Sequence, residues 1–149
     1  MKNILVLLSF VMLVPQAVLS QSSSDLTFKG HVTVVHKNCA DVEISVCQSS
    51  SASPDCMEVD RFTTKKNGQF TVGLEKNSAY EIRVKKDGFV ERVIQVNTSV
   101  GDAELDASKS VFEFDVELSL YPEAKAPVTV ASVYFDGSKE AFDYRLPAK

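Results

Sequence analysis

The sequence of 149 residues contains no tryptophan and only two histidines, and no run after residue 20 is apolar enough to span a bilayer. The missing tryptophan, together with nine phenylalanines, predicts a core built on Phe, Val, Leu and Ile. After residue 20, no segment long enough to form a helix has apolar residues at the three- and four-residue spacing of an amphipathic helix. A net charge of −4 argues against a broad electrostatic surface for nucleic acid, so no nucleic-acid partner is predicted.

Motifs that carry chemistry are also missing, which excludes several enzyme classes. There is no Gly-rich loop for a phosphate, no nucleophile elbow and no HExxH pair of metal-binding histidines. His31, His36 and Cys39 lie near one another in sequence, but a zinc site needs four ligands, or three and a water. A lone cysteine without an orienting partner is more often structural than nucleophilic. We therefore predict no catalytic residue, no metal site, no cofactor and no enzymatic activity, unless His36, Cys39 and an acidic residue converge in one cleft.

Residues 1–20 have the features of a signal peptide. A basic start at Lys2 precedes an apolar run over residues 4–18, and the small residue Ser20 ends a site that a signal peptidase recognises. We predict cleavage after Ser20 and a polar leader over residues 21–25; an uncleaved membrane anchor is the alternative. The mature chain is therefore predicted to be exported, as a periplasmic, outer-membrane-associated or secreted protein without a transmembrane span.

The clearest strand pattern runs from Lys66 to Val96 and predicts a β-meander. Apolar residues alternate with polar ones along residues 70–74 and again along residues 80–84. Asn67-Gly68 predicts a tight type I′ hairpin, because both central residues of that turn need positive φ, and Asp87-Gly88 predicts a second hairpin. The aromatic residues predicted to fill the core are Phe70, Tyr80 and Phe89.

The mature chain as a whole shows about seven strands at spacings of about 8–12 residues, which predicts an all-β, antiparallel β-sandwich. Its predicted extent is residues 26–121. Within it, the strand Phe112–Leu120 alternates apolar and acidic residues, as expected when one face is buried and the other meets solvent. Residues 122–149 are predicted to form a C-terminal extension that can add one hairpin and ends in a frayed tail.

Four features of the segment Phe28–Val96 occur together in a known family. They are an opening strand with a glycine, a turn followed by an aromatic residue, a strand that begins with Tyr, and a second Gly-aromatic turn: Gly30, Asn67-Gly68-Gln69-Phe70, Tyr80–Val84 and Asp87-Gly88-Phe89. In these features the chain resembles the carboxypeptidase regulatory-like domain of exported Bacteroidetes proteins. The resemblance covers about half of the chain and implies a transthyretin-like, or prealbumin-like, sandwich. It does not imply the related hydrolase of purine breakdown, which ends in Tyr-Arg-Gly-Ser where this chain has Tyr144-Arg145-Leu146-Pro147.

Three cysteines are an odd set for an exported protein. Cys47 and Cys56 bracket a Ser-rich loop over residues 48–55, and a disulfide between them would stabilise the fold by about 2–3 kcal/mol in the chain-entropy model. This is the pairing that we predict. Cys39–Cys47 and Cys39–Cys56 are the alternatives, and the remaining thiol is either buried or bonded to another chain.

These features predict an accessory or interaction module in the bacterial envelope. It would present rigid loops or pair through an exposed sheet edge, with an envelope protein or glycan as its partner. Specificity is expected in the Ser-rich loop between the cysteines or in the acidic segment after the meander. That segment alternates Asp102, Glu104 and Asp106 but lacks the pattern of an EF-hand, so a solvated loop is predicted rather than a calcium site.

The alternative is a carbohydrate-binding module that uses exposed aromatic side chains. By their positions, the candidates are Phe62, Tyr121, Tyr134 and Tyr144. Periodicity alone cannot separate a binding platform from the core. A co-planar pair of exposed aromatic rings would favour the carbohydrate-binding function.

Overall fold

The computed structural model of the protein describes residues 26–50, 53–100, 110–118 and 126–147. The predicted signal peptide, the leader, Tyr121 and the acidic residues Asp102, Glu104 and Asp106 lie outside this part of the chain. Within it there is no helix, and so none that could span a membrane. Its ten strands are β1 Leu26–Val34, β2 Lys37–Asn38, β3 Glu43–Ser50, β4 Ser53–Thr63, β5 Gln69–Leu74, β6 Ala79–Lys85, β7 Arg92–Asn97, β8 Val111–Leu118, β9 Val128–Asp136 and β10 Ala141–Arg145.

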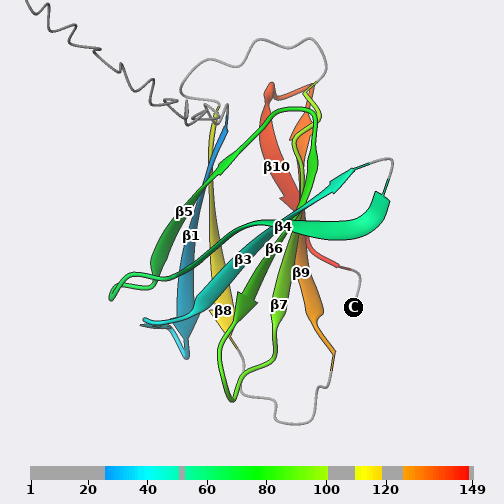
Figure 1. The fold of residues 1–149 in the computed structure, drawn as a ribbon. Helices are drawn as coiled ribbons and strands as arrows, with labels where there is room; N and C mark the ends of the chain where they lie inside the picture. Colours follow the sequence, from blue (N-terminus) through cyan, green and yellow to red (C-terminus); the bar gives the residue numbers. More distant parts are fainter. Residues whose placement is uncertain (1–25, 51–52, 101–109, 119–125, 148–149) are drawn as a thin grey trace, which may run out of the picture.

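The strands form two sheets that pack as a sandwich (Figure 1). In the smaller sheet, here called sheet A, β1 pairs with β5 and the short β2 on one side and with β8 on the other. The larger sheet, sheet B, has the order β10-β9-β7-β6-β3-β4. The predicted all-β sandwich is confirmed. About seven strands and an additional C-terminal hairpin were predicted, and the structure has ten described strands, which include that hairpin.

Two strand pairs are parallel, which corrects the prediction of a purely antiparallel sandwich. β1 pairs in parallel with β8, and β7 pairs in parallel with β9. The chain leaves β7 in sheet B, adds β8 to sheet A and returns to sheet B as β9. Neither parallel pair is therefore joined by a hairpin, and a tight hairpin is the connection that requires antiparallel strands.

The core lies between the two sheets and is built on the predicted residue types. Inward-facing positions alternate along β1, β5 and β6, and in β5 exposed and buried residues alternate over the whole length of the strand. Phe70 and Tyr80 are buried as predicted, and Phe89 packs against the core while partly exposed. The largest fully buried side chains are Phe28, Ile44, Ile82, Ile94 and Leu118.

The predicted β-meander is wrong in its first half. β5 pairs with β1 in sheet A, whereas β4 and β6 belong to sheet B, so β5 lies between two crossings from one sheet to the other. The turn at Asn67-Gly68 therefore closes no hairpin. Only its Gly68 has positive φ, at 76°, which also rules out type I′. The second half is correct, since Asp87-Gly88 joins the antiparallel strands β6 and β7.

The C-terminal hairpin exists and belongs to the sandwich. β9 and β10 pair with each other, and β9 also pairs with β7 in sheet B. Ala131 and Val133 of β9 are buried in the common core. Residues 126–147, which lie within the predicted extension, thus complete sheet B.

Candidate functional site

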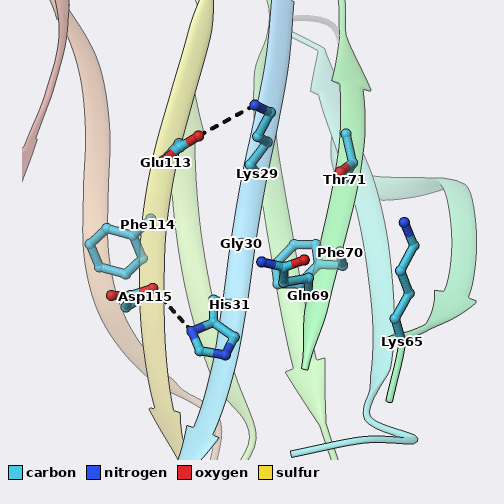
Figure 2. A pocket seen from close by; sticks show the side chains of 10 residues that line it. All are labelled: Lys29, Gly30, His31, Lys65, Gln69, Phe70, Thr71, Glu113, Phe114 and Asp115. Carbon is cyan, nitrogen blue, oxygen red and sulfur yellow. Dashed lines mark hydrogen bonds and ion pairs between the residues drawn. The ribbon is translucent and has the colours of Figure 1, made fainter. Parts of the chain in front are cut away.

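A groove of about 410 Å³ lies on the outer face of sheet A, across β5, β1 and β8 (Figure 2). Gly30 lies at its centre on the middle strand, opposite Phe70 on one neighbour and Phe114 on the other. Lys65, from the segment before β5, lines the groove, and six further polar side chains come from the three strands: Lys29, His31, Gln69, Thr71, Glu113 and Asp115. This composition suits a polar or charged ligand.

The outer face of β8 carries a row of three carboxylates, Glu113, Asp115 and Glu117, which we call the acidic row. The parallel register sets Lys29 beside Glu113 and His31 beside Asp115. The Lys29 Nζ atom lies 3.3 Å from Glu113 Oε1, and His31 Nδ1 lies 3.6 Å from Asp115 Oδ1 (Figure 2).

The third carboxylate, Glu117, faces the histidine of the β1–β2 turn. Its Oε1 atom lies 3.7 Å from His36 Nδ1. At least half of each side chain of the acidic row is exposed. Lys29 is the only permanently charged partner among the three, so the row is negative when both histidines are neutral.

The inner side of β8 carries an aromatic cluster. The Phe112 and Phe114 rings lie 6.5 Å apart, and the Tyr144 ring of β10 meets both edge-on at 6.4 and 5.2 Å. Figure 2 shows the Phe114 ring on the side of β8 that faces away from β1. Tyr144 pairs with the buried Val133 and so shares its inward face, yet Tyr144 is 47% exposed. Within the part of the chain that the structure describes, the strands of sheet A, which is narrower than sheet B, therefore leave this part of the inner face uncovered.

Among the described residues, β8 pairs with one strand only, β1. The backbone N–H and C=O groups on its other edge have no strand partner in that part of the structure. An unpaired edge is a template for another extended chain. The free edge of β8 is eight residues long, with the acidic row on the outer face of the strand and the aromatic cluster on its inner face.

The two cysteines of the predicted disulfide meet on the outer face of sheet B. Cys47 and Cys56 line one groove of about 350 Å³, and both are free thiols in the structure. Arg61 in this groove lies 3.0 Å from Glu43 and 2.6 Å from Glu58, which holds the pKa of the Glu58 carboxyl below its usual value. Partial burial, followed by a hydrogen bond with Cys47, raises the pKa of the Cys56 thiol to about 12.

Alkylation of Cys56 is expected to be unusually slow and to keep accelerating with pH. The thiolate is the reactive form, so a pKa raised from 9.0 to about 12 leaves little of it at neutral pH. We expect the rate of Cys56 alkylation to rise about tenfold per pH unit from pH 7 to 10 and to be at least about a hundredfold below that of an ordinary thiol at pH 8. Peptide mass spectrometry after timed iodoacetamide pulses measures it. The same protein unfolded in urea is the control, and a plateau near pH 9 in the folded protein would contradict the raised pKa.

The residues that the sequence offered for a metal or nucleophile site, His31, His36 and Cys39, do not come together in one cleft. The His36 side chain is exposed beside Glu117, whereas Cys39 is buried in the core with its thiol 3.9 Å from the Ala40 carbonyl oxygen. His31 is hydrogen-bonded to Asn38 at 3.0 Å. No group of three or more metal-binding side chains occurs among the residues that the structure describes.

The aromatic residues of the predicted carbohydrate site are dispersed. Phe62 is half-buried with its ring 6.4 Å from that of Phe70, and the guanidinium of Arg145 covers the Tyr134 ring at 4.6 Å. Tyr144 belongs to the aromatic cluster beneath β8. In the described ranges, the stacked pair Phe112–Phe114 is half-buried, and no co-planar pair of exposed aromatic rings is found.

Sequence reasoning missed the free edge of β8. The alternation along Phe112–Leu120 did predict an acidic outer face and an apolar inner face, and both are present. It carried no information on which strands lie beside β8, because the neighbour β1 is distant in sequence. Lys29 and Glu113, which pair across the two strands, are 84 residues apart.

No protein-family model matches the chain, and no curated protein matches it, so the resemblance to the carboxypeptidase regulatory-like domain stays a prediction. Similar solved structures include catechol 1,2-dioxygenase from Acinetobacter, with 11% identity over 74% of this chain and a TM-score of 0.46. Another is 3-chlorocatechol 1,2-dioxygenase from Rhodococcus opacus, with 17% identity over 62% of the chain and a TM-score of 0.39. A third is the dioxygenase domain of a Streptomyces fusion protein, with 15% identity, 66% coverage and a TM-score of 0.42. The chain spans 60%, 57% and 84% of these three structures.

These neighbours correct the prediction that the chain is not an enzyme. That prediction rested on missing motifs, and the similar solved structures include catechol 1,2-dioxygenases. The exclusion of catalysis is therefore not retained. Identities of 11–17% with TM-scores of 0.39–0.46 assign no reaction to this chain either.

Proposed function

We propose that the protein is an exported interaction module of the bacterial envelope that binds an extended, basic segment of a partner protein along the free edge of β8. The observation that supports this proposal is an eight-residue edge strand flanked by the acidic row and by the uncovered aromatic cluster. Strand addition of this kind obtains affinity from main-chain hydrogen bonds and specificity from alternate side chains.

A strand added beside β8 would extend sheet A over the exposed part of sheet B. Its inward side chains would then lie over Tyr144 and Phe114, which are at present incompletely buried. Burial of apolar area contributes about 25 cal/mol per Å², so apolar residues are favoured at these positions. The outward side chains of the same strand would lie beside the acidic row.

Charge selects the occupant of the edge. A second copy of β8 would bring carboxylates opposite carboxylates, and like charges directly across a strand pair are destabilising. The acidic row therefore disfavours self-pairing, which is a common protection of edge strands. A partner segment that alternates Lys or Arg with apolar residues satisfies both faces at once.

Binding of a designed peptide tests this function directly. We expect the mature protein to bind a fluorescent peptide of alternating Lys and Val, measured by anisotropy at low salt, and to bind the same peptide with Glu in place of Lys much more weakly. Removing the charges of the row with Glu113→Gln, Asp115→Asn and Glu117→Gln is expected to weaken binding by about tenfold or more, since exposed charge pairs contribute up to about 1 kcal/mol each.

The matched control removes three carboxylates elsewhere, with Asp41→Asn, Glu75→Gln and Asp87→Asn, and should leave the affinity within about twofold. N-methylation of the peptide amides that face β8 should abolish binding, whereas methylation of the other amides should not. Equal effects of the two methylation patterns would refute strand addition. Equal losses in the two triple variants would refute the role of the acidic row.

A further inference from the structure

The strand register places Cys47 and Cys56 on the same face of sheet B. Cys47 of β3 lies directly opposite Glu58 of β4, and opposite residues share a face of the sheet. Cys56 precedes Glu58 by two residues, so it points to that face as well. The two thiols are thus diagonal neighbours across one antiparallel hairpin.

The hairpin is irregular at this point. Register shifts occur on both sides of the pairs Cys47–Glu58 and Gln48–Met57, so the ladder is broken where Cys56 lies. Diagonal neighbours in a regular ladder have Cα atoms about 7–8 Å apart, slightly beyond the roughly 4.4–6.8 Å of a disulfide. Because β4 is the outermost strand of sheet B, its backbone can shift toward β3 without breaking a second ladder in the described structure.

Cys39 lies on the other side of sheet B. It is buried in the core cluster, whereas Cys47 faces the outer groove together with Glu43 and Ser45. Sheet B itself separates the Cys39 thiol from the outer pair. The alternatives Cys39–Cys47 and Cys39–Cys56 would each require a residue to turn through the sheet.

We propose that Cys47 and Cys56 form an intramolecular disulfide by exchange with a small disulfide compound, and that Cys39 stays a buried thiol. The half-buried Cys56 reacts first: its thiolate attacks the disulfide RSSR, forming Cys56–S–S–R and releasing RS⁻. The Cys47 thiolate then attacks the Cys56 sulfur, closing the Cys47–Cys56 bond and releasing the second RS⁻. Both protein thiols are oxidised, one RSSR is reduced to two RSH, and the two thiol protons pass to the released thiolates.

The bond would staple the outermost strand of sheet B. β4 lies at the margin of sheet B opposite to β10, so the site is separate from the edge of β8. The crosslink would hold β4 against β3 where their register is irregular. The inference does not depend on the proposed binding function, and the two can fail separately.

The test is a map of the cysteines after equilibration of the mature, folded protein with oxidised and reduced glutathione at about pH 9, where exchange is faster. Exchange is quenched with acid, and free thiols are alkylated with iodoacetamide in two steps, before unfolding and during unfolding, with an isotope-labelled reagent in the second step. We expect a protein mass lower by two hydrogens, a crosslinked peptide pair containing Cys47 and Cys56, and a Cys39 that is alkylated only after unfolding. The variant Cys39→Ser should keep the crosslink, whereas Cys47→Ser and Cys56→Ser should each lose it.

Three results would overturn the inference. One is a crosslink that contains Cys39, and another is a stable glutathione adduct on Cys56 without closure of the ring. The third is complete alkylation of Cys47 and Cys56 at every glutathione ratio. The wild-type map decides between these outcomes even if a cysteine variant fails to fold.

Discussion

Replacing Gly30 with alanine is expected to lower the free energy of unfolding by about 3 kcal/mol. A Cβ atom at Gly30 would lie 2.0 Å from Cζ and 2.1 Å from Cε1 of the Phe70 ring. Gly30 and Phe70 are paired across β1 and β5, and the ring lies over the glycine on the inner face of sheet A. The Phe28 and Phe62 rings pack against the buried Phe70 ring at 6.1 and 6.4 Å, so a movement of Phe70 away from the new methyl group would disturb the core.

A double-mutant cycle separates this clash from other effects of the substitution. Phe70→Leu shortens the side chain and is expected to destabilise by about 1–2 kcal/mol alone. The double variant Gly30→Ala with Phe70→Leu should be more stable than the sum of the two losses predicts, by about 1–2 kcal/mol. Urea unfolding followed by circular dichroism measures all four proteins. Additive losses would show that the close contact is not the cause.

The second large effect is expected for Thr98→Val, at about 2–3 kcal/mol of destabilisation. The Thr98 side chain is fully buried. Its hydroxyl oxygen accepts from the Ser78 N–H at 2.9 Å and lies 2.7 Å from the Glu75 carbonyl oxygen, to which it donates. Valine has nearly the same shape but leaves these part-buried backbone groups without the hydroxyl as their partner, which costs more than the loss of an exposed hydrogen bond.

Thr98→Ser is the control for this prediction. Serine keeps the hydroxyl and lacks the methyl group, so its cost should stay near about 1 kcal/mol. The valine variant should also speed hydrogen exchange at the Ser78 amide, because this amide loses the Thr98 hydroxyl as its acceptor, although the backbone hydrogen bonds between Asn77, Ser78 and Thr98 remain. Equal destabilisation by serine and valine would mean that packing, and not hydrogen bonding, holds this connection.

The turn-forming residues predicted the positions of the turns more reliably than they predicted which strands those turns connect. Asn67-Gly68 and Asp87-Gly88 are both turns, but only the second joins paired strands. Conversely, the two-residue turn between β1 and β2 is made by Val35 and His36, both with positive φ. A β-branched residue is rare in that conformation, so no propensity rule marks this turn.

One candidate site was predicted from the sequence and the other was not. Cys47 and Cys56 were selected from sequence because a short loop separates them, and the structure places both thiols in one groove. The free edge of β8 was not predicted at any particular strand. It depends on how many strands each sheet has, which no local pattern encodes.

The sequence by itself determined that the protein is an all-β sandwich and which face of its regular strands is buried. It did not fix every strand boundary: most of the Ser-rich loop predicted over residues 48–55 belongs to β3 and β4, which end at Ser50 and begin at Ser53. Alternation with a period of two is a local property, so each strand carries it independently of its neighbours. Only the tertiary structure decided that β5 joins sheet A, that β8 and β9 pair in parallel with β1 and β7, and that one edge of β8 is left unpaired in the described chain. The physical reason is that sheet membership follows from contacts between residues far apart in sequence, such as Lys29 with Glu113, and from the competition of all strands for the same core.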